Sequence, residues 1–150
     1  MNSILENYLS FLNESIELGK FDKEFFYSLP GKRELYHNKK DCRYYTILYN
    51  GEKAGIVGFC WSARKPENEG FAQIIIQEKF RGKSILKTAY DLLVKKENLV
   101  ALYASINNNN VSSIKSHLSA GFKKVSSKRE EELRGSGFLQ KGYSRYVKKY

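Results

Sequence analysis

Long apolar segments are absent from this sequence. No run reaches the length of a membrane-spanning helix, and the first residues do not form a basic stretch followed by an apolar one. We therefore expect no membrane span and no secretory signal. Cysteine is also scarce, because Cys42 and Cys60 are the only two, and they lack metal-binding or redox spacing. Reduced thiols, no metal site and a cytoplasmic location are the simplest expectation.

Acidic residues are few relative to basic ones. The 16 Asp and Glu are outnumbered by 26 Lys and Arg, which gives a formal net charge of +10 at pH 7. Such an excess attracts polyanions in general, including nucleic acids, membrane surfaces and phosphorylated cofactors. The sequence has no RNA-binding motif and no helical pattern with a continuous basic stripe. We therefore do not expect nucleic acid to be the partner.

Internal repeats are absent as well. The 150 residues, of which 41% are hydrophobic and 14% aromatic, suit a globular unit with one core. We predict a single domain that covers residues 1–150.

The most informative stretch spans residues 71–86. It starts with an apolar, β-branched run, which predicts a buried strand, and turns through a basic segment at Gly82 into apolar residues at helical spacing. A helix that begins there presents unpaired N–H groups and the positive end of its dipole, and both attract phosphate. Lys79, Arg81 and Lys83 add positive charge. The stretch therefore predicts a phosphate-binding turn.

Two classes of enzyme use such a turn. Gly82, Lys83 and Ser84 match the end of the nucleotide-binding P-loop, but Gln77 stands where that motif requires its first glycine. The next apolar strand, Leu99 to Ile106, contains no Asp that could help to hold magnesium. These two mismatches argue against a nucleoside triphosphatase.

The segment from Lys79 to Ser84 instead resembles the acyl-CoA-binding motif Gln/Arg-x-x-Gly-x-Gly/Ala of the GNAT superfamily of N-acetyltransferases, with departures at its first and last positions. A second segment, Asn110 to Phe122, is similar to the family's helix that begins with Asn and ends in Gly-Phe. The two segments occur in the family order and spacing, and the resemblance covers about residues 43–126. It implies an α/β fold with a mixed, partly splayed β-sheet flanked by helices.

The resemblance also implies acetyl-CoA as the cosubstrate. In the family, the strand before the turn splays from its neighbour, and the pantetheine arm of CoA lies between the two strands. Backbone groups of the strand would contact that arm, N–H groups of the turn would hold the pyrophosphate, and the second helix would lie beside the arm. The residues that this assigns to cofactor binding are Ile74, Ile75, Ile76, Arg81, Gly82, Lys83, Ser84, Ile85, Asn110 and Ser113.

Two residues are candidates for proton transfer. His117 stands where many members of the family have a tyrosine that protonates the departing CoA thiolate, and histidine can also donate a proton. A packed histidine, with a water as the donor, is the alternative. Glu69 is the candidate base for the incoming ammonium, with Glu67 as a second choice, although loop carboxylates are commonly only solvated.

The resemblance therefore implies an N-acetyltransferase that moves an acetyl group from acetyl-CoA to a primary amine by direct attack. The acceptor stays open between a small molecule, a protein N-terminus and a lysine side chain. One alternative is a non-catalytic acyl-CoA-binding domain of the same fold. Another is a small basic nucleic-acid-binding protein, which salt-sensitive retention of DNA or RNA without CoA binding would favour. Whether the protein forms a homodimer is also open.

The N-terminal part of the chain predicts two helices. Ser3 and Glu6 form a capping box, followed by an apolar face that extends to Ile16 and a stop at Gly19. This leaves open whether the family's first strand is present. Asp22 is the expected cap of a second, shorter helix.

The remaining segments predict strands and connections. Tyr44–Tyr49 and Lys53–Trp61 are expected strands, joined by a turn at Asn50-Gly51. Residues 128–137 are expected to form a connection, and Tyr143–Tyr150 a last strand that closes the sheet.

Overall fold

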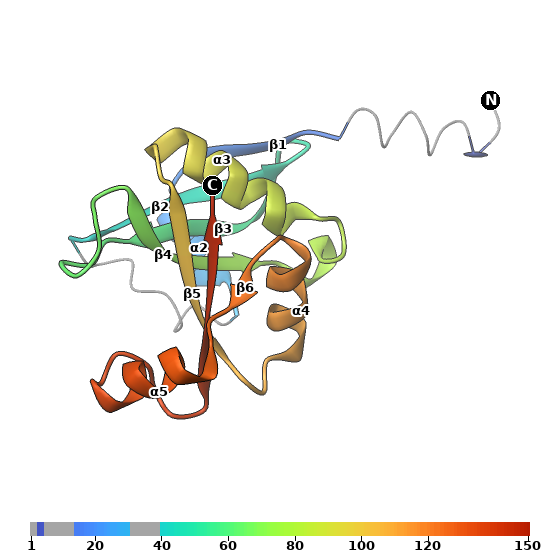
Figure 1. Ribbon diagram of the computed structural model, residues 1–150. Coiled ribbons are helices and arrows are strands. Elements are labelled where there is room, and N and C mark those ends of the chain that lie inside the picture. The colour runs from blue at the N-terminus through green and yellow to red at the C-terminus, as the bar shows by residue number, and fades with distance from the viewer. Residues whose placement is uncertain (1–2, 5–13, 31–39) are drawn as a thin grey trace.

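The computed structural model describes residues 3–4, 14–30 and 40–150. Within these residues, seven strands form one mixed sheet in the order β1-β2-β3-β4-β5-β7-β6 (Figure 1). Neighbouring strands are antiparallel except for the parallel pair β4 and β5. The mixed α/β fold predicted from the sequence is confirmed. The strands are β1 Ile16–Lys20, β2 Cys42–Tyr49, β3 Glu52–Cys60, β4 Glu69–Ile76, β5 Ala101–Asn107, β6 Lys123–Lys124 and β7 Tyr143–Lys149.

Helices cover both faces of this sheet. They are α2 Lys23–Ser28, α3 Ile85–Glu97, α4 Val111–Ser119 and α5 Ser127–Gly135, and a short 3-10 helix, Glu78–Phe80, precedes α3. In the part of the chain that the structure describes, none of the helices has the length and apolarity needed to cross a membrane.

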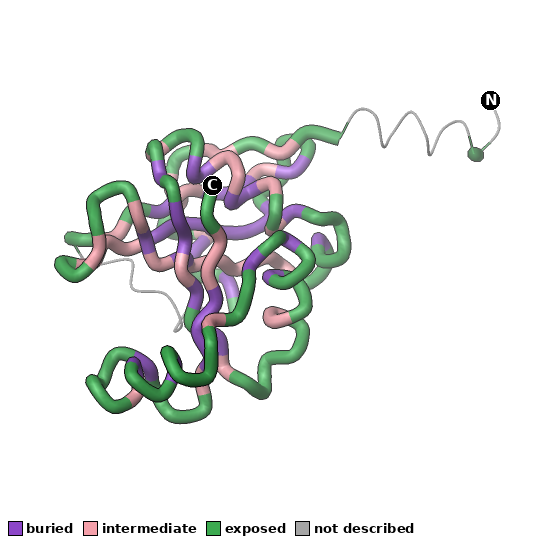
Figure 2. Tube along the Cα trace, in the orientation of Figure 1, coloured by how far each residue is buried: buried purple, intermediate pink, exposed green. Residues whose placement is uncertain are grey.

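The two faces of the sheet carry separate cores. On one face, which we call the α3 face, side chains such as Leu93 of α3 and Leu102 of β5 share one buried cluster. On the other, the α2 face, Phe26 of α2 packs with Ile56 of β3 in a smaller cluster. Figure 2 shows that buried residues gather in the central strands, whereas the connecting loops are mostly exposed. Because side chains alternate along a strand, neighbouring residues of β4 or β5 face opposite cores.

β1 corrects one expectation. Ile16 and Gly19 were expected in a helix, but both lie in a strand that pairs with β2 from Ile16 opposite Tyr49 to Lys20 opposite Tyr45. The pairing with β2 overrides the helical spacing of the apolar residues, since strand preference depends strongly on neighbouring strands. The family's first strand is therefore present. The rest of the expected helix, residues 5–13, lies outside the described residues.

The turn between β2 and β3 is confirmed. Asn50 and Gly51 both have positive φ, 50° and 84°, which a two-residue hairpin turn of type I′ requires. The register shifts opposite Ile47, so that Ala54 forms a bulge next to Gly55. A Cβ atom on Gly55 would lie 2.1 Å from the carbonyl oxygen of Ile75, so β3 and β4 approach closely there.

α5 corrects a second expectation. Residues 128–137 were expected to form a connection, but most of them belong to this helix. The side chain of Ser126 caps it by accepting a hydrogen bond from the N–H of Arg129 at 3.1 Å. The helix has almost no apolar periodicity, and few of its side chains, notably Glu130 and Leu133, are buried. For that reason the spacing of hydrophobic residues could not reveal it.

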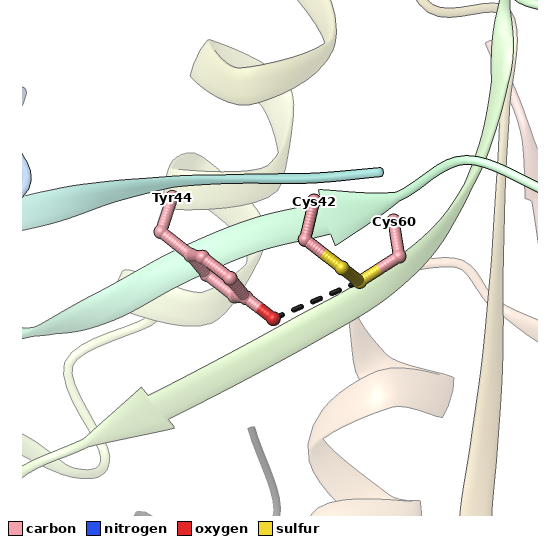
Figure 3. Close-up of a disulfide and its surroundings, with 3 residues drawn as sticks. All are labelled: Cys42, Tyr44 and Cys60. Carbon is pink, nitrogen blue, oxygen red and sulfur yellow. Dashed lines mark hydrogen bonds between the residues drawn. A yellow bond between two sulfur atoms is a disulfide. The ribbon is translucent and has the colours of Figure 1, made fainter. Parts of the chain in front are cut away.

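The two cysteines correct a third expectation. Cys42 and Cys60 lie directly opposite each other at the ends of β2 and β3, and their sulfur atoms form a disulfide (Figure 3). The hydroxyl of Tyr44 lies 3.7 Å from the Cys60 sulfur, on the α2 face. The expectation of reduced thiols was wrong, because sequence spacing did not reveal the strand register that brings the two residues together. The cytoplasmic location stays a prediction without that support.

Breaking this disulfide is expected to lower the free energy of unfolding by about 3 kcal/mol, because the bond closes a loop with a sequence separation of 18 residues. Urea denaturation with and without dithiothreitol measures the difference. The double variant Cys42→Ser/Cys60→Ser should match the reduced protein and should not respond to dithiothreitol. Equal midpoints for the oxidised and reduced wild-type protein would contradict the prediction.

Candidate active site

The parallel strands β4 and β5 separate in the middle of the sheet. Their registered pairs run from Glu69 opposite Ala101 to Phe71 opposite Tyr103, although β4 continues to Ile76 and β5 to Asn107. We call this separation the β4–β5 split. Its closed end is the Phe71–Tyr103 pair, and it opens toward the carboxyl ends of both strands. The partly splayed sheet expected from the sequence is thus confirmed.

Backbone groups of β4 face the split at alternate residues. The N–H of Gln77 donates to the carbonyl of Ala54 in β3 at 2.8 Å, so the backbone of Gln77 faces β3. By alternation, the backbone groups of Ile75 also face β3, and those of Ile74 and Ile76 face the split. The expectation that all three isoleucines offer backbone groups to a ligand is therefore corrected for Ile75, whose backbone is directed to the β3 ladder.

The turn after β4 carries the features that phosphate binding requires. Gly82 has a φ of 79°, and a Cβ atom there would meet nothing within 4 Å. Ser84 also has left-handed backbone, and its side chain caps none of the N–H groups of the first turn of α3. Arg81 and Lys83 are exposed beside it, whereas the side chain of Ile85 is buried and only its backbone is available. The N–H of Arg81 donates to the carbonyl oxygen of Glu78 at 3.1 Å, so the expectation that it binds phosphate is corrected and the free donors begin at Gly82. From there the turn presents N–H donors in a positive environment.

The first turn of α4 contains the other two predicted cofactor residues. Asn110 is exposed and caps the helix, since its side-chain oxygen accepts a hydrogen bond from the N–H of Ser113 at 3.1 Å. That bond uses the oxygen of the amide and leaves its NH₂ group available to a ligand. Ser113 is half-buried one turn further along.

His117 is buried between α3 and α4. Its Nδ1 lies 2.8 Å from the carbonyl oxygen of Ser113, and its Nε2 lies 2.9 Å from the hydroxyl of Tyr90. Nδ1 therefore carries the hydrogen, and Nε2 accepts from Tyr90. Burial lowers the pKa of His117 below its ordinary value, against the smaller opposite effect of the bond to Ser113. The ring is neutral near pH 7, and both of its nitrogens have protein partners.

Glu69 lies at the closed end of the split on the α2 face. Its carboxylate accepts a hydrogen bond from the hydroxyl of Tyr103 at 3.0 Å, and the Tyr103 ring lies 5.5 Å from that of Phe71. Burial and the neighbouring Glu69 raise the pKa of the Tyr103 hydroxyl, so it stays protonated and donates. Phe71 and Tyr103 point away from α3, because their neighbours Ala72 and Leu102 belong to the α3-face core.

The structure divides the predicted residues into two groups. The cofactor candidates other than Ile75 surround the split and the start of α3 and α4. The proton-transfer candidates lie apart from them, Glu69 on the α2 face and His117 enclosed by protein. Sequence reasoning missed Tyr90 and Tyr103, the partners of the two proton-transfer candidates. Both residues occur in apolar runs that predicted core segments. The hydroxyl group of each tyrosine was the only sequence signal that its side chain has a polar partner.

The chain is similar to known proteins in sequence profile and in fold. The profile of the acetyltransferase (GNAT) family matches residues 8–122. No protein with a curated function matches the chain at a significant level.

Three solved structures illustrate the likeness in fold. The Campylobacter jejuni N-acetyltransferase PseH in complex with acetyl coenzyme A has a TM-score of 0.63 at 10% identity, over 90% of this chain and 99% of that one. A Bacillus subtilis acetyltransferase in complex with CoA has a TM-score of 0.64 at 17% identity, over 92% and 99%. A chimeric spermidine N-acetyltransferase SpeG from Vibrio cholerae and hSSAT has a TM-score of 0.63 at 17% identity, over 89% and 95%.

Proposed function

This chain belongs to the acetyltransferase (GNAT) family, and from that membership we propose that it transfers an acetyl group from acetyl-CoA to a primary amine by direct attack within a ternary complex. The observation that carries the proposal is the β4–β5 split. It opens beside the turn around Gly82, which we call the phosphate turn and where no side chain caps the N–H groups at the start of α3.

The residues around the split fit acetyl-CoA. The backbone groups of Ile74 and the N–H of Ile76 would hold the pantetheine arm as a neighbouring strand would, since the carbonyl of Ile76 accepts a hydrogen bond from Nε of Arg81 at 3.3 Å. The N–H groups from Gly82 through Ile85 would hold the pyrophosphate with the side chain of Arg81 beside them, and the open space in front of Gly82 lets the phosphates approach the backbone. The amide of Asn110, with Ser113, would contact the arm from α4.

The chemistry then depends on groups at both ends of the split. When bound, acetyl-CoA supplies the activated acetyl group and a thiolate leaving group. An N–H of Ile74 or Ile76 would stabilise the negative charge that develops on the thioester oxygen. Glu69 would accept the proton of the incoming ammonium, directly or through a water, and His117 or a water would protonate the thiolate.

The experiment that tests the function measures CoA binding and acetyl transfer separately. Isothermal titration with acetyl-CoA reports binding, and release of CoA thiol in the presence of a panel of amines reports transfer. Acetylation of any amine, detected by mass spectrometry, supports an N-acetyltransferase. Binding of acetyl-CoA without transfer to any amine, protein N-terminus or lysine peptide would favour a non-catalytic acyl-CoA-binding domain.

Asn110→Asp is expected to leave the free energy of unfolding nearly unchanged, because aspartate caps a helix as well as asparagine does. It should weaken acetyl-CoA binding about tenfold, because a carboxylate cannot donate the amide hydrogen bond. Asn110→Ser is the uncharged control, since it retains the cap and also lacks the amide. Calorimetry that finds unchanged affinity in both variants would restrict Asn110 to helix capping.

Glu69→Gln is expected to lower kcat/KM for the amine about tenfold near neutral pH, since a general base is removed but a water can replace it in part. The glutamine oxygen can still accept the Tyr103 hydroxyl, so the fold is preserved. At alkaline pH the acceptor is already neutral, and the loss should shrink. Glu67→Gln, an exposed carboxylate two residues away, is the matched control. An equal decrease in both variants would contradict a specific role for Glu69.

A further inference from the structure

Aromatic rings and cations alternate on the α2 face at the closed end of the β4–β5 split. The ammonium of Lys65 lies 4.3 Å from the centre of the Tyr103 ring, and the guanidinium carbon of Arg145 lies 4.9 Å from the centre of the Phe71 ring. Phe71 and Tyr103 are half-buried, as is Lys65, so this cluster borders the surface. It surrounds the carboxylate that we propose as the base, Glu69.

The cations of this cluster are held in place by the fold. The guanidinium of Arg145 donates to the hydroxyl of Ser105 at 3.0 Å and to the carbonyl oxygen of Phe138 at 2.8 Å. The backbone N–H of Arg145 donates to the buried carboxylate of Glu130 in α5 at 2.9 Å. α5 is thereby tied to β7 next to this cluster. Arg64 belongs to the loop before β4, and its guanidinium carbon lies 3.2 Å from the centre of the Phe138 ring. This contact holds the loop next to the cluster.

Positive charge exceeds negative charge in this cluster. Within the described residues, neither Arg64 nor Lys65 forms an ion pair with a carboxylate. The positive charge of Arg129 in α5 acts electrostatically on both Tyr103 and Arg145. Arg129 also forms an ion pair with Glu132 at 3.2 Å. Burial and then the nearby Arg129 lower the pKa of the Arg145 guanidinium, which means that these like charges repel each other. A bound anion would relieve that repulsion.

The excess of cations around Glu69 indicates which kind of amine the site accepts. This inference rests on the proposed function. We propose that the acceptor is a small primary amine that also carries an anionic group, a carboxylate or a phosphate. Lys65 and Arg129 bind the anionic group, and Arg64 adds to the local positive potential. The ammonium lies against Glu69, the negative group among these cations. A polyamine would be a poor acceptor, because its remaining ammonium groups would meet Lys65, Arg129 and Arg145.

The test compares matched pairs of amines that differ in the anionic group. O-phosphoethanolamine against ethanolamine, and β-alanine against β-alaninamide, are titrated into the protein saturated with CoA and followed by NMR. We expect the anionic member of at least one pair to bind about tenfold more tightly, because its contacts are charge-assisted. The preferred pair distinguishes phosphate from carboxylate. The preference should decrease as the salt concentration is raised, since the cations lie near the surface.

Two variants test the assignment of the cations. Lys65→Gln and Arg129→Gln should each reduce the preference for the anionic amine several-fold and leave the binding of its neutral partner unchanged. Lys95→Gln, an exposed lysine of α3 on the other face of the sheet, is the control and should change nothing. Equal binding of both members of each pair, or a preference that survives both variants, would overturn the proposal. Failure of CoA to bind the wild-type protein counts against the proposed function instead, and titration without CoA still tests the anion preference.

Discussion

Replacing Gly82 with aspartate is expected to weaken acetyl-CoA binding by on the order of a hundredfold or more. The new carboxylate would occupy the open space in front of the phosphate turn and repel the pyrophosphate from the free N–H groups of α3. Isothermal titration measures the affinity. A thermal shift assay should show that acetyl-CoA raises the Tm of the wild-type protein but not that of the variant.

Two controls separate charge from backbone strain in this experiment. Gly82→Asn has nearly the same shape and the same positive φ to accommodate, but no charge, so it should retain much more affinity than the aspartate variant. Gly137→Asp places the same side chain at a φ of 80° in open space after α5, so it should match the strain and leave CoA binding intact. Wild-type affinity in Gly82→Asp would remove the phosphate turn from the proposed site.

His117→Phe is expected to lower kcat by on the order of a hundredfold while leaving the affinity for acetyl-CoA nearly intact, if His117 is the proton donor for the thiolate. The structure adds a condition to this proposal. The neutral ring donates from Nδ1 to Ser113 and accepts at Nε2 from Tyr90, so it must exchange one of these partners to reach the thiolate. His117→Tyr should recover part of the rate, because it restores the donor that many members of the family have.

Tyr90→Phe is the control for that condition. It removes the hydroxyl from Nε2 without removing the imidazole, so kcat should be maintained if His117 acts by itself. The His117→Phe variant must be assayed under conditions in which acetyl transfer limits the rate. If it then turns over as fast as the wild type, His117 only packs the core and a water is the proton donor. Rapid-quench measurement of the acetyl-transfer step establishes which step is limiting.

The packing role of His117 has its own pH signature. Burial holds the pKa of His117 below its ordinary value of 6.5 in the folded protein. The unfolded chain therefore binds more protons as the pH falls below about 6.5, and the free energy of unfolding decreases in that range. His117→Phe should remove this part of the acid sensitivity. Denaturation curves at several pH values check it independently of catalysis.

The sequence by itself determined those local elements that turn and cap residues mark. Asn50-Gly51 specified its hairpin turn, because its positive φ angles suit these two residue types. Asp22 and Asn110 specified helix starts, and each caps its helix in the structure. The turn around Gly82 and the helix that follows were predictable for the same reason: each depends on residues a few positions apart. The two motifs also sufficed to identify the family.

Only the tertiary structure decided the features that depend on register and on distant partners. β1 is a strand because β2 is available to pair with it, although its own residues favour a helical pattern. The Cys42–Cys60 bond depends on the alignment of β2 with β3. The cluster around Glu69 joins β4, β5, β7 and α5 through Tyr103 and Arg145, residues that nothing in the local sequence connects. These contacts form between segments far apart in the chain, where spacing along the sequence carries no information about neighbours in space.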